Sequence, residues 1–301
     1  MMSNTPFSLR PYSTPSRMPS DTAGKQGLVH LGFELDSRGY SILRKWERRA
    51  PLIVQQELYF DRGWPELPCV YILSSGGPNV EGDRYRHQIE LKEGAYAHIS
   101  TGAATKLASM QRNYSSLRQN ITLAAGSYLE YLPEPTIPCR DTRYHSEVDI
   151  TISPTATLFH SEIILCGRKH YGELFDYDLL HLSTRVENPQ HSELYADTML
   201  IEPKKRGISH RGIMGDYDIF ATALILTSAT MAEPIYSDAH ELLHNNESIF
   251  GGITHLPNDC GLIVRILGND SGKIKRTMRQ LCAIVRGRVA KRPMYDDFVW
   301  R

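Results

Sequence analysis

Three segments of the chain share one pattern of alternating apolar residues on either side of a small-residue turn. They begin at Ile89, Ile121 and Ile150 and align without gaps over residues 89–99, 121–131 and 150–160. Their offset of roughly 30 residues lies in the range of structural repeats. Such units cannot bury their apolar faces alone, so they stack into a layered or spiral β-body. Ordinary hairpins with common Gly-Ala turns explain the same letters, and both architectures remain open.

The remaining sequence up to about residue 227 also has the pattern of a β protein. Short β-like runs are separated by Gly, Pro, Asn and Asp, and long helical periodicity is missing. Residues 29–35 and 40–46, joined by a turn at residues 36–39, predict an opening hairpin. In residues 144–152, every second residue is apolar or small, which is typical of a strand that buries one face.

Helical patterns appear only near the C-terminus. Ser237 or Asp238 is a candidate cap for a short helix through Asn245, and Ser271 for a longer helix to about Val289. The longer helix is amphipathic, with its basic residues mostly off the apolar face, a pattern that packs on a core or docks a partner. The apolar face consists of Ile274, Met278, Leu281, Val285 and Val289. The basic residues are Lys275, Arg279, Arg286 and Arg288.

These patterns together predict a mainly β fold. We expect a stacked or spiral, antiparallel-rich β-body with two helices near the C-terminus. Residues 1–27 are rich in Ser, Pro and Thr and lack the apolar stretch of a secretory signal, so they predict a disordered N-terminal tail. Residues 28–301 then form one domain.

Composition excludes several classes of partner. The 34 basic and 34 acidic side chains cancel, and neither sign forms a long block, so we expect no nucleic acid partner. No apolar run approaches the roughly 20 residues that span a bilayer, so we expect no membrane partner. The five cysteines are scattered, with no Cys-x-x-Cys pair, which indicates free thiols in a reducing cytoplasm.

Two short motifs suggest chemistry that their surroundings do not support. His240-Glu241-Leu242-Leu243-His244 matches the HExxH string of zinc peptidases, but Glu247 and Phe250 stand where the extended form needs Gly and His. Residues 268–273 resemble a phosphate loop, yet only three residues separate its glycines and Ile274 replaces the Ser or Thr that holds Mg²⁺. We therefore expect a protein that is not an enzyme, and a zinc peptidase remains the alternative.

Polar residues gather at three places in the predicted β-body. A Gly-rich stretch at residues 75–82 is followed directly by Asp83, and small residues at 100–105 precede Lys106. Glu162, Arg168 and Glu173 surround a third turn. The simplest structural roles are amide capping by Asp83, close packing of the small residues and an internal ion pair at the third turn. The functional interpretation is an acid-lined passage for a divalent metal, with His160 as a further donor.

Four stretches of the sequence, in their order and spacing, resemble the UreD (UreH) family of urease accessory proteins. The resemblance runs from about residue 28 to the C-terminus, and the matching stretches are residues 75–83, 101–106, 129–137 and 162–175. The chain departs from the family pattern at Gly102, where a larger polar residue is common, and at Cys139, where an aromatic is usual. Its N-terminal tail is also longer than typical.

The resemblance implies a urease maturation factor. Such a protein joins UreF and the GTPase UreG, binds the urease structural subunits as apo-urease and assists nickel insertion, with no cofactor of its own and Ni²⁺ only in transit. By the same analogy, the residues of a transient nickel passage are Asp83, His160, Glu162 and Glu173. Those of partner binding are Thr101, Lys106, Glu130 and Arg168. A metal-independent β-solenoid binding module is the remaining alternative.

Overall fold

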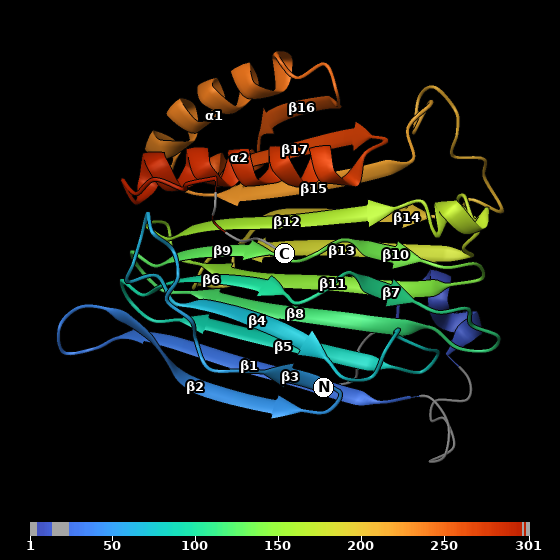
Figure 1. Ribbon diagram of the computed structural model, residues 1–301, viewed down its shortest axis with the longest axis horizontal. Helices are drawn as coiled ribbons and strands as arrows, with labels where there is room; N and C mark the ends of the chain where they lie inside the picture. The colour runs from blue at the N-terminus through green and yellow to red at the C-terminus, as the bar shows by residue number, and fades with distance from the viewer. Residues whose placement is uncertain (1–4, 14–23, 297, 299–301) are drawn as a thin grey trace.

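The computed structural model describes residues 5–13, 24–296 and 298. Two sheets face each other, and the chain winds from one end of the body to the other (Figure 1). The first sheet has the order β14 (Glu193–Ile201), β13 (Leu179–Glu187), β11 (Arg143–Ile152), β8 (Ser115–Leu123), β5 (Arg84–Leu91), β1 (Gln26–Leu35) and β2 (Ser41–Arg49). The second has the order β16 (Phe250–His255), β17 (Gly261–Gly268), β15 (Ile219–Leu226), β12 (Thr157–Leu165), β9 (Tyr128–Leu132), β6 (Tyr96–Thr101), β4 (Cys69–Ser74) and β3 (Leu52–Val54). Two short strands, β7 (Thr105–Leu107) and β10 (Thr136–Pro138), pair beside β12.

The three repeated segments are successive coils of a solenoid-like body. Each runs along the first sheet, turns, and returns in the second, as β5–β6, β8–β9 and β11–β12. Ile89 pairs with Ile121, and Ile121 with Ile150, so the ungapped sequence alignment is also the strand register. In the first two turns, Gly94 and Gly126 have φ of 68° and 67°, a conformation that favours glycine. The stacked arrangement is confirmed, and the hairpin alternative is wrong for these segments.

The expectation of antiparallel-rich sheets needs correction, because the sheets are mixed. The repeat strands pair in parallel with one another in both sheets, whereas β12 also pairs antiparallel with β15. Antiparallel pairs lie towards the sheet margins, including the opening hairpin β1–β2, which is confirmed. Stacked coils place equivalent strands side by side in the same direction, whereas hairpins reverse it.

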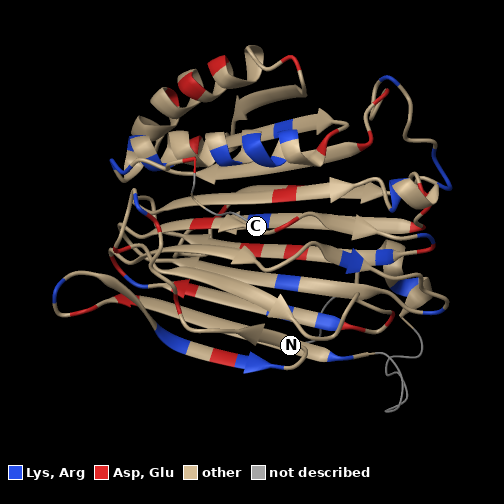
Figure 2. Ribbon diagram, viewed as in Figure 1, with Lys and Arg blue, Asp and Glu red and all other residues tan. Residues whose placement is uncertain are grey.

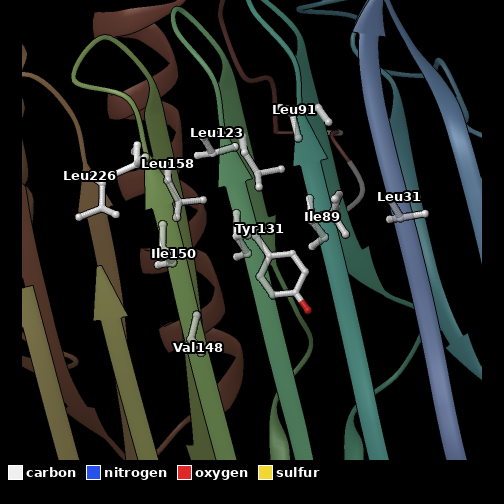
Figure 3. Packing of buried hydrophobic residues seen from close by; sticks show 14 of the residues in the cluster. Leu31, Ile89, Leu91, Leu123, Tyr131, Val148, Ile150, Leu158 and Leu226 are labelled. Atoms are coloured by element: carbon white, nitrogen blue, oxygen red, sulfur yellow. The ribbon is translucent and has the colours of Figure 1, made fainter. Parts of the chain in front are cut away.

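The main core fills the space between the two sheets. Leu31, Ile89 and Ile150 from the first sheet face Leu158 and Leu226 from the second, as Figure 3 shows. All five are at most 1% exposed. This burial stabilises the stack because each coil covers the apolar edge of the next.

Two helices cover the outer face of the second sheet (Figure 1). They are α1 (Ala229–His244) and α2 (Ser271–Val289), and they pack on outward-facing residues such as Ala223 and Val264. Asp270, rather than Ser271, caps α2 by accepting a hydrogen bond from the Lys273 amide at 3.0 Å. The first helix starts about two turns before the predicted position. No helix among the described residues is long and apolar enough to cross a bilayer.

Part of the predicted disordered tail is ordered. Residues Phe7–Tyr12 form the 3₁₀ helix η1, and Leu9 is fully buried against Tyr114 and Leu179. Residues 1–4 and 14–23 of that predicted tail lie outside the described residues.

Candidate functional site

A row of polar side chains crosses the otherwise apolar space between the sheets. His87 of β5 faces Tyr131 of β9, with 3.0 Å between His87 Nδ1 and the tyrosine hydroxyl. On β12, His160 stacks against the Tyr131 ring at a centroid distance of 5.1 Å. Burial lowers the pKa of both imidazoles to about 4, so both are neutral at physiological pH. His160 Nε2 has no hydrogen-bond partner among the described residues, which leaves a buried nitrogen free to bind.

Glu162 lies two residues further along β12 and shares this inward face. Its side chain and those of His160 and Ser146 line a cavity of about 40 Å³, enough for a water molecule. Burial raises the pKa of Glu162 to about 7, although a hydrogen bond with Ser146 opposes this rise. The carboxyl group therefore gains or loses its proton close to neutral pH. A neutral imidazole and a carboxylate of this kind are ligands that suit a divalent cation such as Ni²⁺.

The other two residues predicted for the metal passage lie elsewhere and have different partners. The Asp83 carboxylate accepts hydrogen bonds from the amides of Lys25 at 2.8 Å and Val80 at 3.1 Å, which is the capping role. Glu173 forms an ion pair with Arg168, and these hydrogen bonds lower the pKa of Glu173. Among the described residues, no three His, Cys, Asp or Glu side chains converge as a metal site. The structure thus brings together only His160 and Glu162.

Two of the predicted partner-binding residues line one surface groove. Lys106 and Arg168 border a groove of about 670 Å³, together with Lys169, His170 and Asp218. Lysine and arginine residues gather at this end of the body, near β7 and η2 (Lys169–Tyr171), as Figure 2 shows. Lys169 is paired with Asp218, whereas Lys106 has no ion pair among the described residues. The groove therefore offers cationic side chains to a partner.

Of the other two predicted partner-binding residues, Thr101 is half-buried and Glu130 is buried. The Thr101 hydroxyl accepts a hydrogen bond from the Glu134 amide at 2.9 Å. Glu130 is fully buried, so its expected role in surface contact is corrected to an internal one. Both faces of β9 are covered, one by the first sheet and the other by α2, and therefore no residue of this strand reaches the surface.

Glu130 belongs to a buried ionic cluster that the sequence patterns did not predict. Arg286 of α2 donates two hydrogen bonds of 2.7 Å to the Glu130 carboxylate and a third bond to Asp61. His98 and Tyr128 also bond to Glu130, at 2.9 and 2.8 Å. Burial alone would raise the pKa of Glu130, but the charge and hydrogen bonds of Arg286 hold it well below its usual range. These buried ion pairs connect α2 to the β-body.

Comparison with known proteins decides the family. The family model described as UreD urease accessory protein matches residues 25–301. The chain is 37% identical to Urease accessory protein UreD 2 of Brucella canis over 288 residues, covering 95% of each chain. It is 36% identical to Urease accessory protein UreD of Yersinia enterocolitica over 306 residues, covering 99% of this chain and 93% of the relative. The chain belongs to the UreD family. Its role is therefore in urease maturation, within a family of accessory proteins rather than catalytic ones.

The four stretches that resemble the UreD family lie side by side. Asn79 bridges to Leu107, and Thr136 pairs with both Thr105 and Ile164. These contacts join residues 75–83, 101–106, 129–137 and 162–175 at the end of the body that carries the groove. Segments far apart in the sequence thus form one continuous region.

Neither of the two rejected motifs forms the complete site that its letters suggest in this UreD-family protein. The string at 240–244 lies on α1, with both histidines exposed and no third ligand among the described residues. Residues 268–273 join β17 to α2, and the Asp270 carboxylate occupies the helix N-terminus where a phosphate loop would bind its anion.

Proposed function

We propose that this protein is a cytoplasmic scaffold that binds apo-urease together with UreF and the GTPase UreG and assists the insertion of nickel. Membership of a urease accessory family supports the general role. The absence of a phosphate loop at residues 268–273 supports the assignment of GTP hydrolysis to UreG.

The observation that carries this proposal is the convergence of the four family-like stretches at the groove. A groove with Lys106, which has no ion pair in the part of the chain that the structure describes, and with exposed Arg168 is suited to a carboxylate-bearing segment of a partner. Exposed cations of this kind mainly raise the association rate and set orientation, which is what a scaffold needs. The groove is therefore the partner-binding surface of the proposal.

Of the four residues predicted for the nickel passage, only His160 and Glu162 lie together, and the proposed passage contains these two. Both side chains point into the space between the sheets, and both offer the nitrogen and oxygen donors that Ni²⁺ accepts. Two protein ligands hold an ion less firmly than a complete site does, so an ion here is passed on rather than retained. The protein then needs no cofactor of its own.

Co-expression with the urease subunits and the other accessory proteins tests the scaffold role. We expect urease without this chain to accumulate as apoprotein with little nickel, measured by metal analysis of the purified enzyme. Lys106→Glu reverses one charge in the groove and should weaken capture of the partners in a pull-down. Arg38→Glu, in the turn between β1 and β2, is the matched control. If urease made without this chain is fully loaded with nickel, the proposal is wrong.

Glu162→Gln separates the nickel passage from the scaffold. This substitution keeps the shape of the side chain and removes its charge. If the passage is used, the complex still forms but urease contains less nickel. If urease nickel is unchanged with Glu162→Gln and with His160→Gln, the chain is a metal-independent binding module.

A further inference from the structure

The outer side of α1 carries a ladder of four aromatic rings that no role described above requires. Tyr236 stacks between His255 of β16 and His240, at centroid distances of 4.7 and 5.8 Å. The His240 ring is followed by that of His244 at 6.1 Å, with an angle of only 8° between the ring planes. The three histidines are exposed.

His240 and His244 have the spacing of a chelating pair. Residues four apart on a helix lie on one face, with Cβ atoms about 5–6 Å apart. Rotation about the side-chain bonds of these exposed residues therefore brings one nitrogen of each ring to about 2.0–2.1 Å from a common metal ion, the usual length for Zn²⁺. Neither imidazole forms a hydrogen bond or ion pair among the described residues, so no existing bond opposes this rotation.

The charge around the pair also favours a cation. Helix α1 contains no Lys or Arg, and its negative charge comes from Glu233 and Glu241, because Asp238 is paired with Arg288 of α2. Figure 2 shows red acidic residues on α1 and no blue Lys or Arg there. His244 lies in the last turn of α1, where the partial negative charge of the helix terminus stabilises a cation.

We propose that His240 and His244 bind one first-row divalent transition-metal ion, such as Ni²⁺, Cu²⁺ or Zn²⁺, at the surface of α1. Imidazole nitrogen suits each of these ions, and the two rings supply two ligands. Water fills the remaining positions, because the described residues place no third His, Cys, Asp or Glu there. The ion is therefore exchangeable, and the site performs no hydrolysis. The proposal is independent of the inter-sheet passage at His160 and Glu162.

Metal titration of the full-length protein, purified without a polyhistidine tag, tests this site. Isothermal titration calorimetry with NiCl₂, and separately with ZnCl₂, gives the number of sites and their affinities. We expect His240→Ala and His244→Ala each to remove one site or to weaken it at least tenfold, the lower limit for the loss of even an indirect metal contact. His255→Ala should leave this site intact, because the Tyr236 ring separates His255 from His240.

A double substitution controls for histidine content. Glu241→His combined with His244→Ala keeps two histidines on the helix, but at adjacent positions that do not face each other. We expect this variant to behave like His244→Ala. Equal affinity in the wild type and in this control, or equal loss in His255→Ala, would overturn the proposal. Helix content and Tm, measured by circular dichroism, show that every variant is folded, so an unchanged fold with lost binding supports the site.

Discussion

Replacement of Arg286 by Met tests whether the buried ionic cluster fastens α2 to the β-body. Met fills much of the volume of the arginine stem but removes the charge and the donors. Glu130 and Asp61, both at most 2% exposed, would then be left without their shared cation. Loss of one partner of a buried pair costs about 3–5 kcal/mol, because the remaining charge is neither hydrated nor paired.

Arg288→Met is the matched control. Arg288 lies on the same helix and pairs with Asp238 through Nε at 2.6 Å, but the arginine side chain is 45% exposed. Exposed pairs of this type contribute about 1 kcal/mol or less. Against a typical total stability of about 5–15 kcal/mol, only the Arg286 variant should lose a large share.

Urea denaturation followed by circular dichroism, at pH 7 and pH 5, measures both effects. In the wild type, the pKa of Glu130 is lowered, so its contribution is present above the unfolded value of about 4.3 and is lost as the pH falls below it. In Arg286→Met, burial without the cation raises that pKa, and acid then relieves the unpaired charge. The stability difference between the two proteins should therefore narrow at pH 5. If the free energies of unfolding of Arg286→Met and Arg288→Met agree within about 1 kcal/mol at pH 7, the reasoning is refuted.

Three further predictions follow from the core, the cavity and α1. Ile121→Ala should lower the free energy of unfolding by about 2–5 kcal/mol through the cavity it leaves, whereas exposed Thr122→Ala should change it little, as measured by urea denaturation. Because burial raises the pKa of Glu162 to about 7, its contribution to stability is present below the unfolded value and is lost as the pH rises through 7. The Tm of Glu162→Gln relative to wild type should therefore increase from pH 5 to pH 8, and a constant difference would contradict this. Glu241→Gln should leave urease maturation unchanged in the co-expression assay, whereas a peptidase would need that base.

The stacking of the repeats could be predicted from sequence, but the direction of strand pairing could not. Apolar alternation around Ile89, Ile121 and Ile150 gave the correct register between coils. A strand, a turn and a second strand have the same local pattern whether the second strand pairs with the first or crosses to the opposite sheet. Only the tertiary structure distinguishes a hairpin from such a crossing, which is why antiparallel pairing was overestimated.

The errors at the candidate site arise where a residue is covered on more than one side. Glu130 lies in a strand with both faces buried, so simple alternation did not reveal that its side chain points towards α2. Arg286 was placed with the polar residues because of its charge, although it lies four residues after buried Cys282 and eight after Met278, on the same stripe. Pro234 obscured the first turns of α1 because it is unfavourable inside a helix.

The same buried cluster has a consequence for synthesis of the chain. Arg286 follows Asp61 by 225 residues and Glu130 by 156 residues, so both acids leave the ribosome long before their counterion exists. The coils can stack early because each needs only its neighbours, but these two carboxylates must remain hydrated or protonated until the last helix arrives. The outer layer is therefore completed only after α2 has left the ribosome.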